Sequence, residues 1–178
     1  MSIAVRLRPY QPSDVPQLHA AIVESQAEVG PWLPDLLGAL NPANLHAWLD
    51  AQAADRTAGR NYHFAIVSDP DDAVLGGCGL TNPNRRHQFA NLYYWVRSSA
   101  ARQGVASAAV RLAARFAFAE LRLQRVEIVV DRRNLASLRA AEKSGATREG
   151  LLRNRLRTGE EACDAYMFSL IPEDLEER

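Results

Sequence analysis

Arg102-Gln-Gly-Val-Ala-Ser107 joins a strand-like run, Leu92-Tyr-Tyr-Trp-Val96, to a long helix with an apolar face. The first N–H groups of a helix have no acceptor within the helix, and the aligned peptide dipoles give that end partial positive charge. Gly104 leaves room for a ligand because it has no Cβ. The segment therefore predicts a site for a phosphate or pyrophosphate, although taken alone it also fits a helix that simply begins at a glycine.

The chain has 178 residues, of which 47% are hydrophobic and 24% are charged. This size and composition predict a single globular domain over residues 1–178. No stretch approaches the ~20 apolar residues that cross a bilayer, and the first residues lack the apolar core of a secretory signal. We therefore expect a cytoplasmic protein without a membrane partner, in which Cys78 and Cys163 are free thiols.

The charges balance overall, with 21 basic and 21 acidic residues, so a global nucleic-acid footprint is missing. Residues 97–143 nevertheless hold ten Lys or Arg against four Asp or Glu, a local excess of six positive charges. This excess suits a polyanionic ligand beside the 102–107 loop, although each arginine also fits a solvated helix face. The four histidines have no metal-ligand spacing, so no metal is expected.

The periodic segments predict a strand over residues 3–8, followed by a helix that Ser13-Asp14 caps. After a rigid loop over residues 30–34 that holds Trp32, Asn41-Pro42 begins a second helix as N-cap and first helical residue. Three strands with turn-forming connections then predict an antiparallel meander; they cover residues 62–67, 74–80 and 89–96.

A buried strand over residues 127–130 follows the helix that begins at the 102–107 loop. A helix of this length between two strands predicts a right-handed crossover with the strands parallel, and ligands collect beyond the carboxyl ends of such strands. Asn134 begins another helix, which Gly145 ends. Residues 153–157 and 162–170 are expected to form a closing hairpin.

A longer pattern makes these expectations specific. Asn134-x-x-Ser137-x-x-x-x-Glu142-Lys143-x-Gly145-Ala146-x-x-Glu149-Gly150 follows Gln-Gly-Val-Ala by about thirty residues and resembles the GNAT superfamily of N-acetyltransferases. Four further segments resemble the branch of ribosomal-protein-alanine and ribosomal-protein-serine acetyltransferases. They are Leu7-Arg-Pro, Pro31-Trp-Leu-Pro34, Tyr94-Trp-Val96 and Asp164-x-Tyr166-x-x-Ser-Leu170.

The resemblance implies a mixed α/β (α+β) fold with flanking helices. The expected central sheet has about seven mostly antiparallel strands, and its one parallel pair splays between the strand ending at Val96 and the strand around Val130. Acetyl-CoA is the implied cosubstrate, entering from one side, and a protein N-terminal α-amine is the implied acceptor, entering from the other. A homodimer is left open.

The resemblance also assigns residues. The amides from Gln103 to Ser107 are expected to hold the pyrophosphate, and the acceptor is expected to contact Trp32, Asn91 and Tyr94. The full set expected to bind acetyl-CoA is Trp95, Val96, Arg97, Arg102, Gln103, Gly104, Val105, Ala106, Ser107, Asn134, Ser137 and Lys143. Plainer interpretations stay open: Asn134 and Ser137 also fit an ordinary helix cap, Lys143 an ion pair, and Trp32 the core.

The expected mechanism is direct transfer of the acetyl group without an acyl-enzyme, because neither cysteine lies beside a histidine in a catalytic motif. Main-chain N–H groups near Val96 and Arg97 would bind the acetyl oxygen. The tyrosine that many family members carry as an acid is Ala141 here, so Ser137 is predicted to hydrogen-bond the departing sulfur.

Two further departures from the family pattern affect the chemistry. Ala101 replaces a Gln or Arg three residues before Gly104, and Arg102 is expected to supply the charge instead. A family glutamate is Asn91 here, and an amide cannot accept a proton at neutral pH. An α-amine, with a free pKa of about 7.7 to 8.0, needs less help from a base than a lysine amine near 10.4. The loss therefore favours α-amine acceptors, with ordered water as the base.

Three other functions remain as alternatives. The first is a small-molecule N-acetyltransferase that acts on a polyamine, antibiotic or amino acid, which the fold does not exclude. The second is a non-catalytic acetyl-CoA-binding module. The third, a nucleotide-binding module, ranks last because the glycine patterns typical of such sites are missing.

Overall fold

The computed structural model describes residues 3–33, 42–158 and 160–176. Pro34 and the predicted N-cap Asn41 lie outside the described residues. In chain order the elements are β1 (Val5–Arg8), α1 (Val15–Val29), α3 (Pro42–Thr57), β2 (Tyr62–Ser68), β3 (Val74–Asn84), β4 (Phe89–Val96), α4 (Val105–Ala119), β5 (Arg125–Asp131), α5 (Leu135–Lys143), β6 (Thr147–Thr158) and β7 (Glu161–Leu170).

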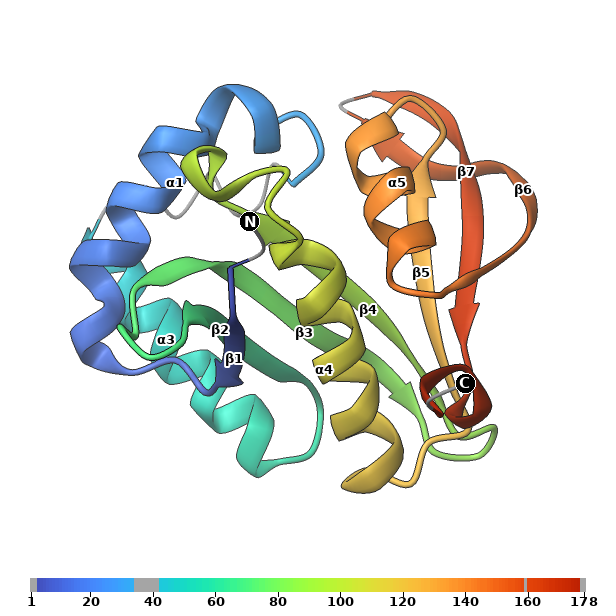
Figure 1. Ribbon diagram of the computed structural model, residues 1–178, viewed down its shortest axis with the longest axis horizontal. Helices are drawn as coiled ribbons and strands as arrows, with labels where there is room; N and C mark the ends of the chain where they lie inside the picture. The colour runs from blue at the N-terminus through green and yellow to red at the C-terminus, as the bar shows by residue number, and fades with distance from the viewer. Residues whose placement is uncertain (1–2, 34–41, 159, 177–178) are drawn as a thin grey trace.

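The strands form one seven-stranded sheet in the order β1-β2-β3-β4-β5-β7-β6 (Figure 1). Strands β4 and β5 are paired in parallel, and the other neighbours are antiparallel. The predicted mixed sheet with one parallel pair is therefore confirmed. Helix α4 makes the expected crossover between the two parallel strands.

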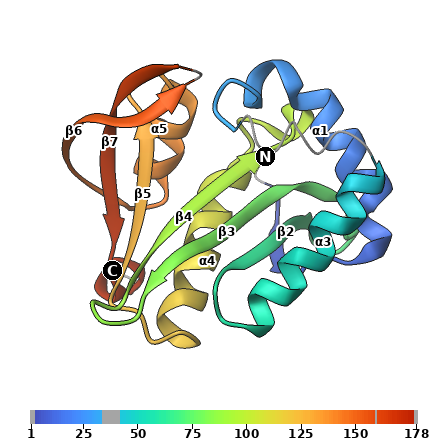
Figure 2. The same cartoon turned by 180° about the vertical axis from the view of Figure 1, so that it is seen from behind.

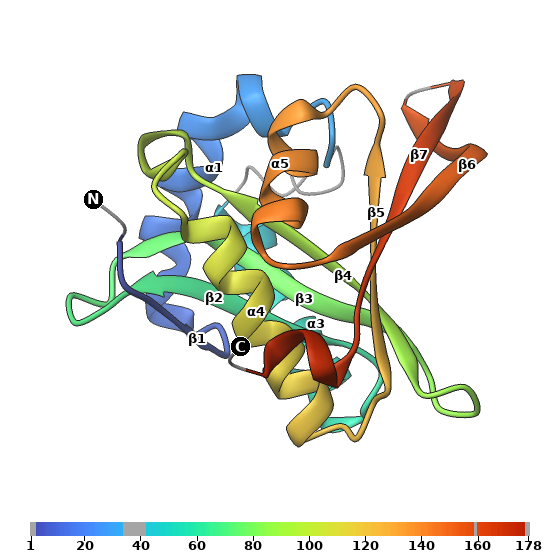
Figure 3. The same ribbon diagram turned by 45° about the vertical axis from the view of Figure 1, so that its right-hand side comes forward.

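Helices cover both faces of the sheet (Figure 3). On one face, α4 and α5 pack over a core that includes Val110, Ala113 and Leu138. On the other face, α1 and α3 pack over a second core that includes Leu18, Leu45 and the side chain of Trp95. Because side chains alternate along a strand, β4 contributes Leu92 and Tyr94 to the first core, and Tyr93 and Trp95 to the second.

Strands β4 and β5 are hydrogen-bonded together at one end only. The paired residues are Phe89 with Arg125, Ala90 with Val126, and Asn91 with Glu127. Beyond these three pairs the strands diverge, as seen from behind in Figure 2. On its other side β4 stays paired with β3 as far as Val96. The sheet therefore opens at the carboxyl ends of its two parallel strands.

Two strands extend four or more residues beyond their predicted ranges. Strand β3 runs to Asn84 rather than to residue 80, and β6 begins at Thr147 rather than at residue 153. Strand β6 is the edge strand of the sheet, and most of its side chains are exposed. An edge strand of this kind has no clear apolar alternation, which is the signal that the sequence prediction used.

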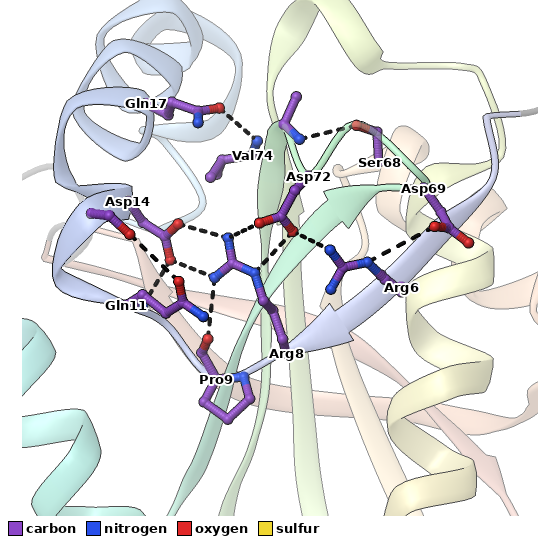
Figure 4. Close-up of polar contacts among 12 residues, drawn as sticks. Arg6, Arg8, Pro9, Gln11, Asp14, Gln17, Ser68, Asp69, Asp72 and Val74 are labelled. Carbon is purple, nitrogen blue, oxygen red and sulfur yellow. Dashed lines mark hydrogen bonds and ion pairs between the residues drawn. The ribbon is translucent and has the colours of Figure 1, made fainter.

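The start of α1 also differs from the prediction. Asp14 occupies the N-cap position but makes no capping bond with α1. Its carboxylate instead accepts two hydrogen bonds of 2.7 Å from the Arg8 guanidinium and one of 2.8 Å from the Gln11 N–H (Figure 4). Arg8 also donates to Asp72 in the turn between β2 and β3. One partly buried arginine thus ties β1, the start of α1 and this turn together.

Candidate active site

The 102–107 loop presents a helix end whose first N–H groups point away from the helix body. Gly104 is the N-cap of α4 with φ of +80°, a left-handed conformation that favours glycine. The first intrahelical bond joins the Ala108 N–H to the Gly104 carbonyl at 3.0 Å, so the N–H groups of Val105, Ala106 and Ser107 precede the helical ladder. No side chain caps this end among the described residues. The helix start therefore has the N–H groups that an anion would need, and the binding of an anion there stays a prediction.

The exposed Arg102 side chain lies at the start of the same loop. Its backbone is left-handed, with φ of +63°, which is uncommon for a residue with a Cβ. Gly104 takes the same region two residues later. Left-handed residues at these two positions curl the main chain, and a curled backbone can turn several N–H groups toward one point.

Helix α1 holds the segment that leads into the loop, a contact that the sequence did not predict. The Glu24 carboxylate accepts the Ser99 N–H at 2.6 Å and the Arg97 Nε at 3.0 Å. The Ser25 hydroxyl oxygen accepts the Ser98 N–H at 3.0 Å, and Glu28 accepts the Ser98 hydroxyl at 2.9 Å. The only sequence signal was a polar stripe on an otherwise apolar-faced helix, which is indistinguishable from a solvated face.

Arg97 has a different role from the one expected. Its N–H donates to the Leu75 carbonyl on β3 at 2.8 Å, so it is already paired and is not the donor predicted for the acetyl oxygen. Its guanidinium pairs with Glu24. The Glu24 pKa falls to about 2, first because of the hydrogen bonds from Arg97 and then because of the Ser99 N–H. Arg97 therefore anchors the loop to α1.

Of the two main-chain N–H groups predicted to bind the acetyl oxygen, that of Val96 is the one that Arg97 leaves as a candidate. Successive N–H groups of a strand point to opposite edges, so the Val96 N–H points toward β5 when that of Arg97 points toward β3. The β4–β5 pairing ends at Asn91, five residues earlier. The Val96 N–H therefore faces the open part of the sheet.

Helix α5 begins on the other side of this opening. The Asn134 Oδ1 accepts the Ser137 N–H at 3.0 Å, which confirms the plain interpretation of Asn134 as a helix cap. The Ser137 Oγ lies 2.9 Å from the Tyr94 hydroxyl, which also lies 2.9 Å from the Ser137 carbonyl oxygen. The Asn134 Oδ1 is thus engaged in the cap, and its side-chain N–H₂ is the part of Asn134 that a ligand would contact.

Tyr94 lies on a different face from the one expected. The prediction placed it with Trp32 and Asn91 as an acceptor contact, but its side chain points to α4 and α5 and meets Ser137. The reason is the alternation along β4, which sends Tyr94 to the face opposite Trp95. Burial raises the Tyr94 pKa to about 12, partly offset by the hydrogen bond with Ser137. The hydroxyl therefore stays protonated at neutral pH.

Asn91 and Trp32 are the other two residues that were expected to contact the acceptor. Asn91 belongs to the face that carries Tyr93 and Trp95, and its Oδ1 is buried without a hydrogen-bond partner among the described residues. Trp32 is partly exposed in the turn after α1, where its N–H donates to the Val29 carbonyl at 3.0 Å. Contact of either residue with an acceptor stays a prediction.

Lys143 is the exposed last residue of α5. It lies at the opposite end of a nine-residue helix from Asn134, roughly 13 Å away at the α-helical rise. Helices α4 and α5 are joined near this end by the Arg111 guanidinium, which donates to the Ser144 carbonyl at 3.2 Å. The predicted contact of Lys143 with the cofactor phosphates stays a prediction.

The sequence also led to predictions about the cysteines, possible metal ligands and possible membrane-spanning helices. Cys78 and Cys163 are free and buried, and burial raises the pKa of the Cys78 thiol. Within residues 3–33, 42–158 and 160–176, no cluster of three or more His, Cys, Asp or Glu forms a metal-ligand set. Over the same ranges no helix has the length and apolar character needed to cross a membrane.

Residues 4–147 match the family model described as the acetyltransferase (GNAT) domain. The chain therefore belongs to the GNAT acetyltransferase domain family, as its motifs predicted.

Known proteins resemble different shares of the chain. The "Probable N-acetyltransferase YjcK" of Bacillus subtilis is 33% identical over 117 residues, which cover 65% of this chain and 65%, just under two thirds, of YjcK. The "Putative ribosomal N-acetyltransferase YdaF" of the same organism is 27% identical over 97% of this chain and 93% of YdaF. The structure of Mycobacterium smegmatis RimJ in complex with CoA-disulfide aligns with a TM-score of 0.89 and 25% identity, over 97% of this chain and 84% of that one.

Proposed function

We propose that this protein is an acetyl-CoA-dependent N-acetyltransferase that acts on the N-terminal α-amine of a protein. The observation that carries the proposal is the uncapped start of α4 beside the carboxyl end of β4, at the point where β4 and β5 have separated. These two features together give a phosphate site next to an open strand edge. A long ligand with a phosphate at one end and a reactive group at the other fits that combination.

Acetyl-CoA suits these residues by charge and by shape. The N–H groups of Val105, Ala106 and Ser107 would hold the pyrophosphate at the positive end of the α4 dipole. Arg102 adds a cation at the same place, and Gly104 leaves the backbone accessible. The pantetheine arm would then run along the free edge of β4, and its thioester supplies an activated acetyl group.

The main chain and two hydroxyls carry the proposed chemistry on the cofactor side. The Val96 N–H would donate to the acetyl oxygen, which gains negative charge as the amine adds. Tyr94 donates its proton to the Ser137 carbonyl oxygen and so holds the start of α5 beside β4, where the Ser137 hydroxyl would donate to the departing sulfur. Burial raises the pKa of the Cys78 thiol, so this cysteine is a poor nucleophile and direct transfer is preferred.

The nature of the acceptor is supported by likeness and by amine chemistry. YdaF is named as a ribosomal N-acetyltransferase, and RimJ shares the fold over nearly the whole chain. An α-amine is partly neutral at physiological pH, whereas a lysine amine is almost fully charged. Strand β4 contains no acidic residue, which favours the acceptor that is easier to deprotonate.

The experiment that tests the proposal is thiol release from acetyl-CoA with a library of peptides that vary in their first residues. Free amines, namely spermidine, an aminoglycoside and single amino acids, are assayed in parallel. Mass mapping of the product then locates the acetylated nitrogen. We expect turnover with peptides and acetylation at the α-amine.

Two outcomes would replace the proposal. Efficient turnover of a free amine with little turnover of peptides would establish the small-molecule enzyme. Tight acetyl-CoA binding without thiol release for any amine would establish a non-catalytic binding module.

A further inference from the structure

Asn91 and Glu127 lie side by side at the point where the sheet opens. They are the last of the three residue pairs that join β4 to β5. Directly paired residues on neighbouring strands have backbones about 4.8 Å apart and side chains on the same face. An amide and a carboxylate are therefore neighbours at the closed end of the opening.

The two side chains point to the face opposite Tyr94 and Ser137. On β4, Asn91 shares its face with Tyr93 and Trp95, which pack toward α1 and α3. On β5, the neighbours of Glu127 in sequence, Val126 and Ile128, pack toward α4, so Glu127 points away from them. The pair is thus reached from the side on which the acceptor is expected.

Asn91 and Glu127 both have oxygen atoms available to a ligand. The Asn91 Oδ1 is buried and has no partner among the described residues. The Glu127 side chain is 19% exposed, and within the described part of the chain its Oε1 alone is engaged, by the Arg125 Nε at 2.8 Å. A buried hydrogen-bond acceptor without a partner lowers the stability of the protein. A substrate N–H that donates to such an atom therefore gains more binding free energy than it would at a solvated acceptor.

The charges around Glu127 leave a negative excess. Both terminal nitrogens of Arg125 donate to Glu149, at 2.6 and 2.5 Å, while its Nε serves Glu127. Two carboxylates therefore share one guanidinium, for a local charge of minus one. Tyr93 is the next titratable group on this face of β4; burial raises its pKa, and its hydroxyl is hydrogen-bonded to His63, so it adds no charge at neutral pH.

The amine that attacks a thioester must lose a proton, and β4 itself offers no carboxylate or histidine to accept it. We infer that Glu127 is the group that binds the incoming ammonium and accepts its proton, while the Asn91 Oδ1 accepts a second N–H and orients the nitrogen. This inference rests on the proposed function. One ammonium proton passes through the Glu127 carboxylate to solvent before the amine attacks. The new C–N bond then forms as the C–S bond breaks, and the second proton, which the nitrogen loses as the amide forms, goes to the departing sulfur, so that CoA leaves as the thiol.

The test compares wild type with Glu127→Gln in steady-state acetylation of a peptide with a free N-terminus. The change is nearly isosteric and leaves Arg125 paired with Glu149, so the fold is expected to persist. We expect kcat/KM for the peptide to fall at least about 100-fold at pH 6.5, the lower range of general acid–base contributions. At pH 8.5 the loss is expected to shrink about tenfold, because the α-amine is then already neutral.

Two matched variants separate proton transfer from structure. Glu149→Gln removes the other carboxylate on Arg125 without touching Asn91, and its kcat/KM is expected to stay within about threefold of wild type at both pH values. Asn91→Glu combined with Glu127→Gln moves the carboxylate across to β4. This double variant is expected to recover at least tenfold of the lost kcat/KM at pH 6.5.

The inference is overturned if the loss in Glu127→Gln is the same at both pH values, if it is smaller than about threefold, or if Glu149→Gln reproduces it. Acetyl-CoA affinity, measured by calorimetry, is expected to be unchanged in all three variants. Failure of the proposed function looks different, because wild type itself then acetylates no peptide at any pH.

Discussion

The hydroxyl oxygens of Tyr94 and Ser137 lie 2.9 Å apart, and this contact joins β4 to α5 across the cofactor side of the opened strand pair. The two residues are 43 positions apart in the sequence. Tyr94 is held protonated by burial, which raises its pKa to about 12. Tyr94 also donates to the Ser137 carbonyl oxygen at 2.9 Å, so the two residues act as one unit in which the tyrosine fixes the position of the serine.

Tyr94→Phe and Ser137→Ala are expected to have the same consequence. Each change should lower kcat about tenfold, which corresponds to one hydrogen bond of about 1.4 kcal/mol in the transition state. Because both disrupt the same unit, the double variant should be no slower than either single one. Acetyl-CoA affinity should stay within a fewfold. Additive losses, or an unchanged kcat in Ser137→Ala, would remove the pair from the mechanism.

Gly104→Glu is expected to abolish acetyl-CoA binding without unfolding the domain. A carboxylate at this position would meet the pyrophosphate where the α4 dipole would otherwise attract it. The backbone there is left-handed, so any side chain also adds strain of about 1–2 kcal/mol. Gly104→Ala carries that strain without the charge and serves as the control. Calorimetric titration with acetyl-CoA provides the measurement, and binding retained by Gly104→Glu would refute the site.

Arg8→Met is expected to destabilise the protein by about 3–5 kcal/mol, because it leaves the buried Asp14 carboxylate without a cation. The Asp14 side chain is only 3% exposed. Arg6→Met is the matched control, since Arg6 and Asp72 form an exposed pair and its loss should cost less than about 1 kcal/mol. Urea denaturation followed by circular dichroism gives both values. Equal losses would show that burial does not govern this network.

Stability is expected to fall as the pH drops from about 5 toward 2. The pKa of Glu24 beside Arg97, and that of Glu149 beside Arg125, are each lowered to about 2 from 4.5. A carboxyl whose pKa is lower in the folded state stabilises the fold above its unfolded pKa, and this contribution disappears as the folded carboxyl is protonated. Glu24→Gln should therefore flatten the dependence of the urea midpoint on pH. The same slope in the variant would contradict the assignment.

The local features of the site could be predicted from the sequence. The glycine that precedes the helical pattern of α4 predicts the 102–107 loop. Asn134, three residues before Ser137, predicts a helix cap. Each of these signals comes from residues that lie within about one helical turn of one another. The crossover between β4 and β5 follows equally from the length of α4. These elements were found because short-range chemistry determines them.

The contacts between distant segments could not be predicted. Whether the Arg97 N–H faces β3 or β5 depends on strand register, which the composition of β4 does not reveal. The same register decides that Glu127 lies beside Asn91 and that Tyr94 meets Ser137. The hold of Glu24 on Ser99 depends on how α1 packs over the sheet. Each is a tertiary relationship between residues that are unremarkable in their own segments.

The short pairing between β4 and β5 has a consequence for amide hydrogen exchange. Along the second half of β4, the N–H groups of Tyr93 and Trp95 point into the paired β3 edge, whereas those of Tyr94 and Val96 point into the opening. Protection should therefore alternate residue by residue along a single strand. A ligand that lies in the opening takes the place of the missing neighbour, so its arrival should slow exchange at every second amide.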